Sequence, residues 1–322
     1  MINELKRQVS NAIDDAAGKS KHNNLYIFFD IVTSMLKYGA SPNKYSEFEF
    51  YKLNRQQRKT YGTHRLSNKM IKRLNDDKYR DVFENKLEFA KRFNEFFRRD
   101  FISSKCEENE FMKFAEKNKK VICKPIHEAQ ANGIKVLNLD KSKEELKKIY
   151  LELHGSKETI IEEWIVQHDD ISRIYPNAVN CLRIITAGTN PVSLLTGGVT
   201  FALDGEIANG SKKSIVAPVN METGIIDRPA ATFGSELYYN HPTTGMRIMG
   251  LKIPYWDEVI LMLSKAAKLV PEVKYVGWDI AITKDGPCLI EGNTSPGYKY
   301  YQIPKHLDGG IGNREKYEKF LK

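Results

Sequence analysis

Residues 277–297 read GWDIAITKDGPCLIEGNTSPG, which is two apolar stretches joined by an Asp-Gly pair. Apolar residues on both sides of such a pair are typical of a β-hairpin. Three side chains with oxygen ligands interrupt the apolar pattern: Asp279, Glu291 and Asn293. The register of the hairpin decides whether these oxygens share one face, and so decides what site the sequence predicts.

Two turn lengths give opposite arrangements of the acidic side chains. A two-residue Asp-Gly loop would turn Glu291 to the face opposite Asp279. A three-residue loop, residues 284–286, would place Asp279 directly across from Glu291, and strand alternation would add Asn293 to that face. Such loops favour a glycine with positive φ at their last position, which Gly286 supplies. We therefore expect the three-residue loop.

Two carboxylates that face each other repel unless a cation lies between them. Two carboxylates and an amide form an all-oxygen ligand set, which suits Mg²⁺ when nucleotide phosphates complete its coordination. We therefore predict that Asp279, Glu291 and Asn293 form a Mg²⁺ site. The alternative is a pair of surface carboxylates at strand ends, and the apolar flanking residues argue against it.

Composition is that of an ordinary globular protein, with 322 residues, 41% of them hydrophobic and 28% charged. The N-terminal residues lack the apolar region of a signal peptide, and no apolar run approaches a membrane span. The four cysteines are scattered without a CxxC pair, which argues against a zinc site or a disulfide framework. We expect a cytoplasmic protein.

The net charge of +9 is concentrated in one part of the chain. Residues 51–100 contain fifteen Lys and Arg against seven Asp and Glu. This block could meet nucleic acid, an anionic membrane surface, a polyanionic glycan or nucleotide phosphates, or it could be a solvated helical surface.

The hydrophobic pattern predicts an α+β fold in three parts. Residues 1–80 read as helical, including an apolar helix over residues 25–39 that ends on a glycine. Residues 81–166 begin with a helix that carries Leu87, Ala90, Phe93 and Phe97 on one stripe. A small lobe of strand, loop, strand, helix and strand follows, and its strands are residues 119–126, 133–139 and 158–167. Strands dominate residues 167–322.

Basic side chains inside apolar segments are candidates for contacts with phosphate. Lys124 closes an apolar strand, and Arg183 lies in the apolar run NCLRIIT, so each requires an anionic partner. Arg183 could hold a transferring phosphate, or it could form a structural ion pair. Lys86, on the preceding helix, would by itself be read as a solvated lysine.

Two further segments could surround a nucleotide. The loop 127–133 has the position of a phosphate-covering loop but is poor in glycine. The run of Glu162, Glu163, Trp164 and Ile165 could form an adenine-binding segment, although acidic residues on an edge strand are the simpler interpretation.

The order of these segments along the chain resembles that in the ATP-grasp superfamily. The resemblance implies a fold with two α+β lobes that hold ATP between them. The sequence motif GWDIAITKDGPCLIEGN, together with NAVNCLRI and HPTTG, is similar to motifs of the sugar-transfer-associated ATP-grasp family. That family is similar to teichuronopeptide-biosynthesis proteins. The resemblance covers roughly residues 80–305, and a helical N-terminal segment replaces the domain that usually precedes the grasp.

The resemblance implies a role for each of these side chains. Lys86 and Lys124 would contact ATP phosphates, and Arg183 would steady the γ-phosphate and then an acyl phosphate. The segment 162–165 would line the adenine, with Asp169 or Asp170 near the ribose. The hairpin ligands would hold one or two Mg²⁺ ions.

The activity that the resemblance implies is an ATP-dependent carboxylate–amine ligase. Its expected carboxylate is a uronic acid of a capsule or other surface polysaccharide, or the nucleotide-sugar precursor of one. Its amine would be an amino acid or a small amino alcohol. The alternatives are a sugar or small-molecule kinase and a non-catalytic module that binds polyanions. The sequence leaves open whether the N-terminal helices bind substrate, membrane or a glycosyltransferase; we expect no nucleic-acid partner.

Overall fold

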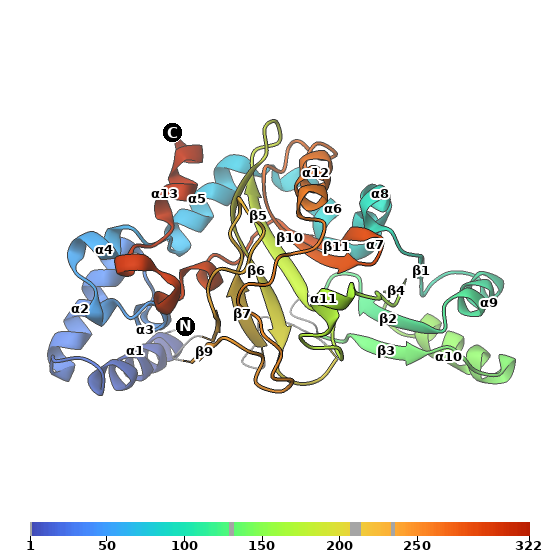
Figure 1. Ribbon diagram of the computed structural model, residues 1–322, viewed down its shortest axis with the longest axis horizontal. Coiled ribbons are helices and arrows are strands. Elements are labelled where there is room, and N and C mark those ends of the chain that lie inside the picture. The colour runs from blue at the N-terminus through green and yellow to red at the C-terminus, as the bar shows by residue number, and fades with distance from the viewer. Residues whose placement is uncertain (1, 129–131, 207–213, 233–235) are drawn as a thin grey trace.

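The computed structural model describes residues 2–128, 132–206, 214–232 and 236–322. Its parts follow one another along the longest axis: N-terminal helices at one end, a large sheet in the middle and a small sheet at the other end (Figure 1). Part of the glycine-poor loop 127–133 lies outside the described residues.

The N-terminal region is helical, as the sequence predicts. Its helices are α1 (Ile2–Ala17), α2 (Asn24–Tyr38), α3 (Pro42–Glu47), α4 (Arg55–Lys59) and α5 (His64–Leu74). The expected helix is α2, which begins where the Asn23 side chain accepts a hydrogen bond from the Tyr26 N–H. It ends at Gly39, whose φ of 69° is the left-handed conformation of a C-terminal cap.

Three short helices lie in the second half of the basic block: α6 (Asp81–Glu84), α7 (Lys86–Arg92) and α8 (Asn94–Phe97). The sequence predicts one helix here, and the structure divides it at Phe93 into α7 and α8. All four residues of the predicted stripe are buried. Phe93 packs on Trp278 of the large sheet, with ring centroids 5.5 Å apart, so these helices belong to the core of the large sheet.

The small lobe contains a four-stranded antiparallel sheet in the order β1-β4-β2-β3. Its strands are β1 (Phe101–Ser103), β2 (Lys120–Pro125), β3 (Lys135–Asn138) and β4 (Thr159–Glu163). Helices α9 (Glu108–Lys117) and α10 (Lys143–Gly155) pack on it. The predicted strand, loop, strand, helix, strand order is confirmed, whereas β1 and α9 are additions that the sequence interpretation missed.

The large sheet is antiparallel, in the order β11-β10-β5-β6-β7-β8-β9. Its strands are β5 (Cys181–Ala187), β6 (Ser193–Ala202), β7 (Ser214–Pro218), β8 (Ala230–Ala231), β9 (Leu237–Tyr238), β10 (Tyr275–Thr283) and β11 (Gly286–Asn293). Helix α11 (Asp169–Ser172) precedes β5, α12 (Trp256–Ala266) precedes β10, and α13 (Arg314–Glu318) lies near the C-terminus.

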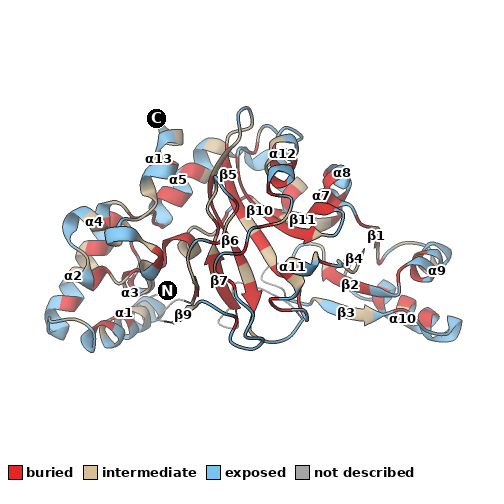
Figure 2. Ribbon diagram, in the orientation of Figure 1, coloured by how far each residue is buried: buried red, intermediate tan, exposed pale blue. Residues whose placement is uncertain are grey.

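The two faces of the large sheet are covered by different helices. One face packs on α12 and on α6–α8 in the main hydrophobic core, which contains Leu182, Ile184 and Trp278 (Figure 2). On the other face, α5 and α13 cover one part, with Ile185 and Tyr275 in that smaller cluster. Because side chains alternate along a strand, Arg183 lies on the face of Ile185 and not in the main core.

The prediction of a three-residue hairpin loop is wrong, although the predicted pairing of Asp279 with Glu291 is correct. Thr283 pairs with Gly286, so the loop is the two residues 284–285. Gly286 has the positive φ that was expected, at 110°. Ile280 pairs with Leu289 but Asp279 pairs with Glu291, so β11 contains one extra residue, a β-bulge. The extra residue shifts the pairing of β11 with β10 by one position, and as a result Asp279 faces Glu291.

Gly292 is a position in this hairpin where a side chain would collide with the core. A Cβ atom there would lie 2.8 Å from Cδ1 of Phe83 and 3.0 Å from Cε2 of Phe89. Both rings are buried in the main core and have little room to move. The glycine lets α6 and α7 press directly onto the strand that carries Glu291.

We predict that Gly292→Ala destabilises the protein by about 1–3 kcal/mol, because the new methyl group overpacks the core. The measurement is the free energy of unfolding in urea. Gly297→Ala is the matched control, since a Cβ atom there meets nothing within 4 Å. Equal stability of the two variants would contradict the proposed contact.

Candidate active site

Three neighbouring strands bring the predicted metal ligands and Arg183 together. Arg183 on β5 pairs in register with Asp279 on β10, which pairs with Glu291 on β11. The Arg183 guanidinium donates from Nε and Nη2 to the two carboxylate oxygens of Asp279. Its Nη2 lies 3.9 Å from Oε1 of Glu291. The arrangement is one cation facing two carboxylates.

Asn293 completes this cluster from the same strand as Glu291. Its Nδ2 donates to Oε1 of Glu291 at 3.3 Å, so both side chains are on the same side of the strand. The sequence expectation that Asp279, Glu291 and Asn293 would converge therefore agrees with the geometry.

The electrostatics of the cluster favour an added cation. Burial, together with the nearby negative charge of Asp279, raises the pKa of Glu291. The ionised form of Glu291 is therefore costly until more positive charge arrives. The donor set of two carboxylates and an amide oxygen fits Mg²⁺ completed by phosphate oxygens. Within the described ranges, no group of three or more His, Cys, Asp or Glu residues is placed to hold a metal ion.

Lys124 lies in a buried network of charges on the small lobe. Its Nζ donates to Oε2 of Glu162 at 2.9 Å. The same oxygen accepts from Nε and Nη2 of Arg99, at 2.8 and 2.7 Å. Glu162 is almost completely buried, and its one carboxylate compensates two cations. The Glu162 side chain thus fixes the position of Lys124.

Lys86 begins α7 and approaches the same region from the large-sheet side. Its Nζ donates to the carbonyl oxygen of Glu128 at 2.6 Å. Burial lowers the pKa of Lys86, and the negative charge of Glu291 opposes this shift. Lys86 and Lys124 are both among the cations that act on Glu291. Basic groups from α7 and β2 therefore surround the carboxylate cluster.

The predicted adenine segment continues from β4 into the connection to the large sheet. The Glu163 and Trp164 N–H groups donate to the carbonyl oxygens of Asp100 and Lys120, at 2.9 and 3.1 Å. Lys120 Nζ also lies 3.8 Å from the centroid of the Trp164 ring. Ile165 is half-buried.

Asp169 lies on the surface at the start of α11, where its carboxylate pairs with Lys284 Nζ at 3.2 Å. This contact joins α11 to the turn of the β10–β11 hairpin. The predicted ribose-binding residue is therefore close to the hairpin in space, although more than a hundred residues separate them in sequence.

Sequence reasoning missed Arg99 and Tyr301. Arg99 is the middle residue of the charged run RRD, and no local pattern distinguishes it from its exposed neighbour Arg98. Tyr301 is buried, and its electrostatic interaction with Arg183 and Asp279 puts it beside the ion pair. It lies in the stretch after the hairpin, where the tyrosine-rich sequence GYKYY was the available signal.

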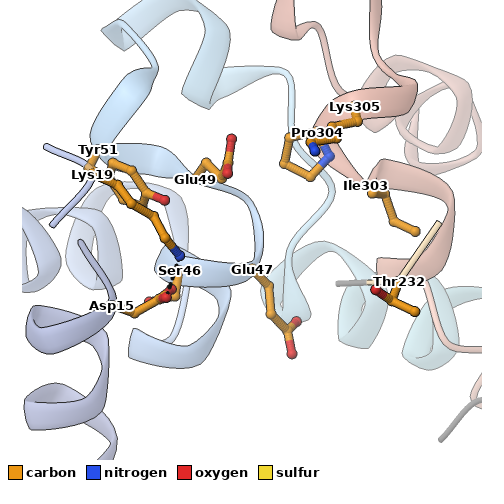
Figure 3. Close-up of a pocket in the computed structure, with 10 residues that line it drawn as sticks. All are labelled: Asp15, Lys19, Ser46, Glu47, Glu49, Tyr51, Thr232, Ile303, Pro304 and Lys305. Atoms are coloured by element: carbon orange, nitrogen blue, oxygen red, sulfur yellow. Dashed lines mark hydrogen bonds and ion pairs between the residues drawn. The ribbon is translucent and has the colours of Figure 1, made fainter. Parts of the chain in front are cut away.

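A cavity of about 190 Å³ lies elsewhere in the described part of the chain (Figure 3). It lies between the N-terminal helices and a C-terminal segment that includes Pro304. Three carboxylates line it: Asp15, Glu47 and Glu49. None of the predicted site residues does so, and the carboxylate hairpin forms a separate site.

Comparison with known proteins gives one match that covers most of the chain. The sequence profile of the family described as sugar-transfer associated ATP-grasp matches residues 65–316. No curated protein sequence matches the chain.

Several solved structures are distantly similar. The ATP-grasp ligase PsnB complexed with minimal precursor is 12% identical, with a TM-score of 0.48, over 77% of this chain and 63% of that chain. The VanG D-Ala:D-Ser ligase from Enterococcus faecalis is 15% identical, with a TM-score of 0.45, over 74% and 60%. The D-alanine–D-alanine ligase from Bacillus anthracis, complexed with ATP, is 15% identical, with a TM-score of 0.45, over 74% and 65%. The chain spans less than two thirds of the length of each.

The profile match runs from α5 through both sheets and includes every predicted site residue. It confirms the expected family and the ATP-grasp fold. The expected N-terminal helices are present in the structure. The chain belongs to the sugar-transfer-associated ATP-grasp family.

Proposed function

We propose that the protein is an ATP- and Mg²⁺-dependent carboxylate–amine ligase that forms an amide through an acyl phosphate. The observation that carries the proposal is the pair of facing carboxylates, Asp279 and Glu291, with Arg183 against them. Lys86 and Lys124 act on the same cluster from other elements. Asp279, Glu291 and Asn293 would suit Mg²⁺, which would supply positive charge next to the nucleotide phosphates.

Each side chain has one task in this proposal. Asp279, Glu291 and Asn293 hold one or two Mg²⁺ ions, which neutralise charge on the phosphates. Lys86 and Lys124 bind phosphate oxygens, and Glu162 holds Lys124 in place. Glu162 thereby contributes to the nucleotide site through its partner.

The nucleoside is proposed to lie along the connection between the two sheets. Glu163, Trp164 and Ile165 would line the adenine, and Asp169 would approach the ribose. The half-buried Ile165 and the ring of Trp164 supply apolar surface there.

In the first step, a substrate carboxylate oxygen bonds to the γ-phosphorus and ADP departs. In the second step, the amine attacks the acyl carbon and phosphate departs. Arg183 is placed to offset negative charge on the transferring group in both steps. The remaining contribution of the chain is to position the reactants and exclude water.

The proposed carboxylate is a uronic acid of a capsule or other surface polysaccharide, or of its nucleotide-sugar precursor. The amine is an amino acid or a small amino alcohol. The family's association with sugar transfer and the basic block of residues 51–100 support an acidic glycan acceptor.

The first test concerns metal-dependent nucleotide binding. We expect ATP with Mg²⁺ to raise the melting temperature of the protein, and ATP with a chelator to do so much less. Asp279→Asn combined with Glu291→Gln should abolish the Mg²⁺-dependent part, because the anionic ligands are gone. Asp285→Asn, in the exposed turn of the same hairpin, is the control. A full Mg²⁺ response in the double variant would refute the metal site.

The second test separates the binding of ATP by Lys124 from the positioning of Lys124 by Glu162. We expect Lys124→Met to lower ATP affinity about tenfold or more by removing a charged contact to phosphate. Its fold should remain, since Arg99 still neutralises Glu162. Glu162→Gln should instead destabilise the protein by about 3 kcal/mol, because two buried cations lose their counter-charge. Calorimetric titration and urea unfolding measure the two effects.

The third test concerns the reaction. ADP release is measured with uronates and amines, singly and in pairs, and we expect rapid release only when both are present. Rapid release without an amine, with a stable phosphoester as product, would identify a kinase and contradict the ligase assignment.

A further inference from the structure

Helix α2 is apolar on the side that points away from the protein as well as on the side that packs on it. Its inner residues Ile27 and Ile31 are completely buried. Its outer residues Leu25, Phe29 and Leu36 are 66%, 59% and 71% exposed. These three are four and seven residues apart, so they lie on one stripe of the helix. A helix that is apolar all round normally has apolar surroundings on every side.

The exposed stripe continues at its edges. Tyr26 and Phe28 flank it and are also exposed. Exposed apolar side chains that occur singly are ordinary, but a contiguous group on one helix marks an interaction surface. Figure 2 shows α2 at the end of the molecule opposite the small sheet, and the described residues leave the outer side chains of α2 exposed.

The charges around this stripe are basic. The acidic residue of α2, Asp30, is turned inward, where it pairs with Arg58. Lys21 just before the helix and Lys37 in its last turn are both exposed. The outer side of α2 therefore presents apolar and cationic groups without a carboxylate.

Helix α5 extends the basic character from the C-terminal end of α2. Arg65 in its first turn donates from Nη2 to the Leu36 carbonyl oxygen at 3.2 Å, so the two helices meet there. Lys69, Lys72 and Arg73 are exposed further along α5, which contains no acidic residue.

We propose that the outer face of α2, with the basic side of α5, docks on an anionic membrane surface. The 15 residues of α2 are fewer than the ~20 that a spanning helix needs, so α2 would lie along the interface. Leucine and aromatic side chains enter the boundary between headgroups and acyl chains, and flanking lysines contact anionic headgroups. Both kinds of group are present on this surface.

The charge pattern argues against a second copy of the chain as the occupant. In a two-fold dimer the same patch meets itself, so the exposed cations of α2 and α5 would be brought together. Like charges placed across an interface weaken it. An anionic lipid surface has the complementary charge.

The experiment is flotation of the purified full chain with vesicles. One set contains phosphatidylcholine and phosphatidylglycerol in equal parts, and the other contains phosphatidylcholine alone. We expect binding to the anionic vesicles that decreases with salt. Phe29→Ser combined with Leu36→Ser should lower the partition coefficient about tenfold or more. Lys69→Glu combined with Lys72→Glu should remove the preference for anionic vesicles.

The control variant is Leu151→Ser with Leu261→Ser, which alters residues 56% and 55% exposed on α10 and α12. It should bind vesicles like the unaltered chain. The substituted residues are exposed in all three variants, and thermal melting verifies that each is folded.

Two results would overturn the proposal. One is that the unaltered protein fails to bind anionic vesicles or binds them equally after the α2 substitutions. The other is that sedimentation shows a dimer that the α2 substitutions dissociate, with no vesicle binding, which would make this face a protein interface.

Discussion

One guanidinium group against two carboxylates on adjacent strands is the interaction on which the candidate site depends. It exists only while β5, β10 and β11 keep one register, with Arg183, Asp279 and Glu291 side by side. The packing behind these strands holds that register. Helices α6–α8 press their phenylalanine rings onto β11 and onto Trp278, and Gly292 leaves room for that contact. Packing on the apolar face of the large sheet therefore fixes the positions of the charged side chains on its opposite face.

The parts of the fold that could be predicted from the sequence are those with local periodicity. Helix α2 and the succession of strand, loop, strand, helix and strand in the small lobe follow from spacing along the chain. The shared face of Asp279 and Glu291 was predicted from a three-residue loop, whereas the structure reaches it with a two-residue loop and a bulge. The assignment of the family likewise came from short motifs whose order was informative. The division at residues 1–80, 81–166 and 167–322 remains a prediction. The placement of α6–α8 on the large sheet shows how packing can cross such boundaries.

The features that the sequence did not predict depend on contacts between distant residues. Arg99 and Glu162 are 63 positions apart, and nothing near Arg99 indicates that it is buried against a carboxylate. The division of the helix at Phe93 follows from the position of Trp278, far along the chain. The predicted adenine segment also depends on distant contacts. From the sequence, Glu162 is interpreted as a carboxylate on an edge strand, and only its two cationic partners show that it is part of a buried charge network.

The β-bulge at Ile290 has a consequence for how the family can vary. Because the bulge and not the turn aligns Glu291 with Asp279, the tip of the hairpin is free to gain or lose residues in pairs during evolution. If the ladder ran without the bulge, Ile290 would pair with Asp279 and Glu291 would turn to the opposite face. The facing carboxylates therefore depend on a one-residue irregularity in the backbone, which a comparison of amino-acid identities alone would pass over.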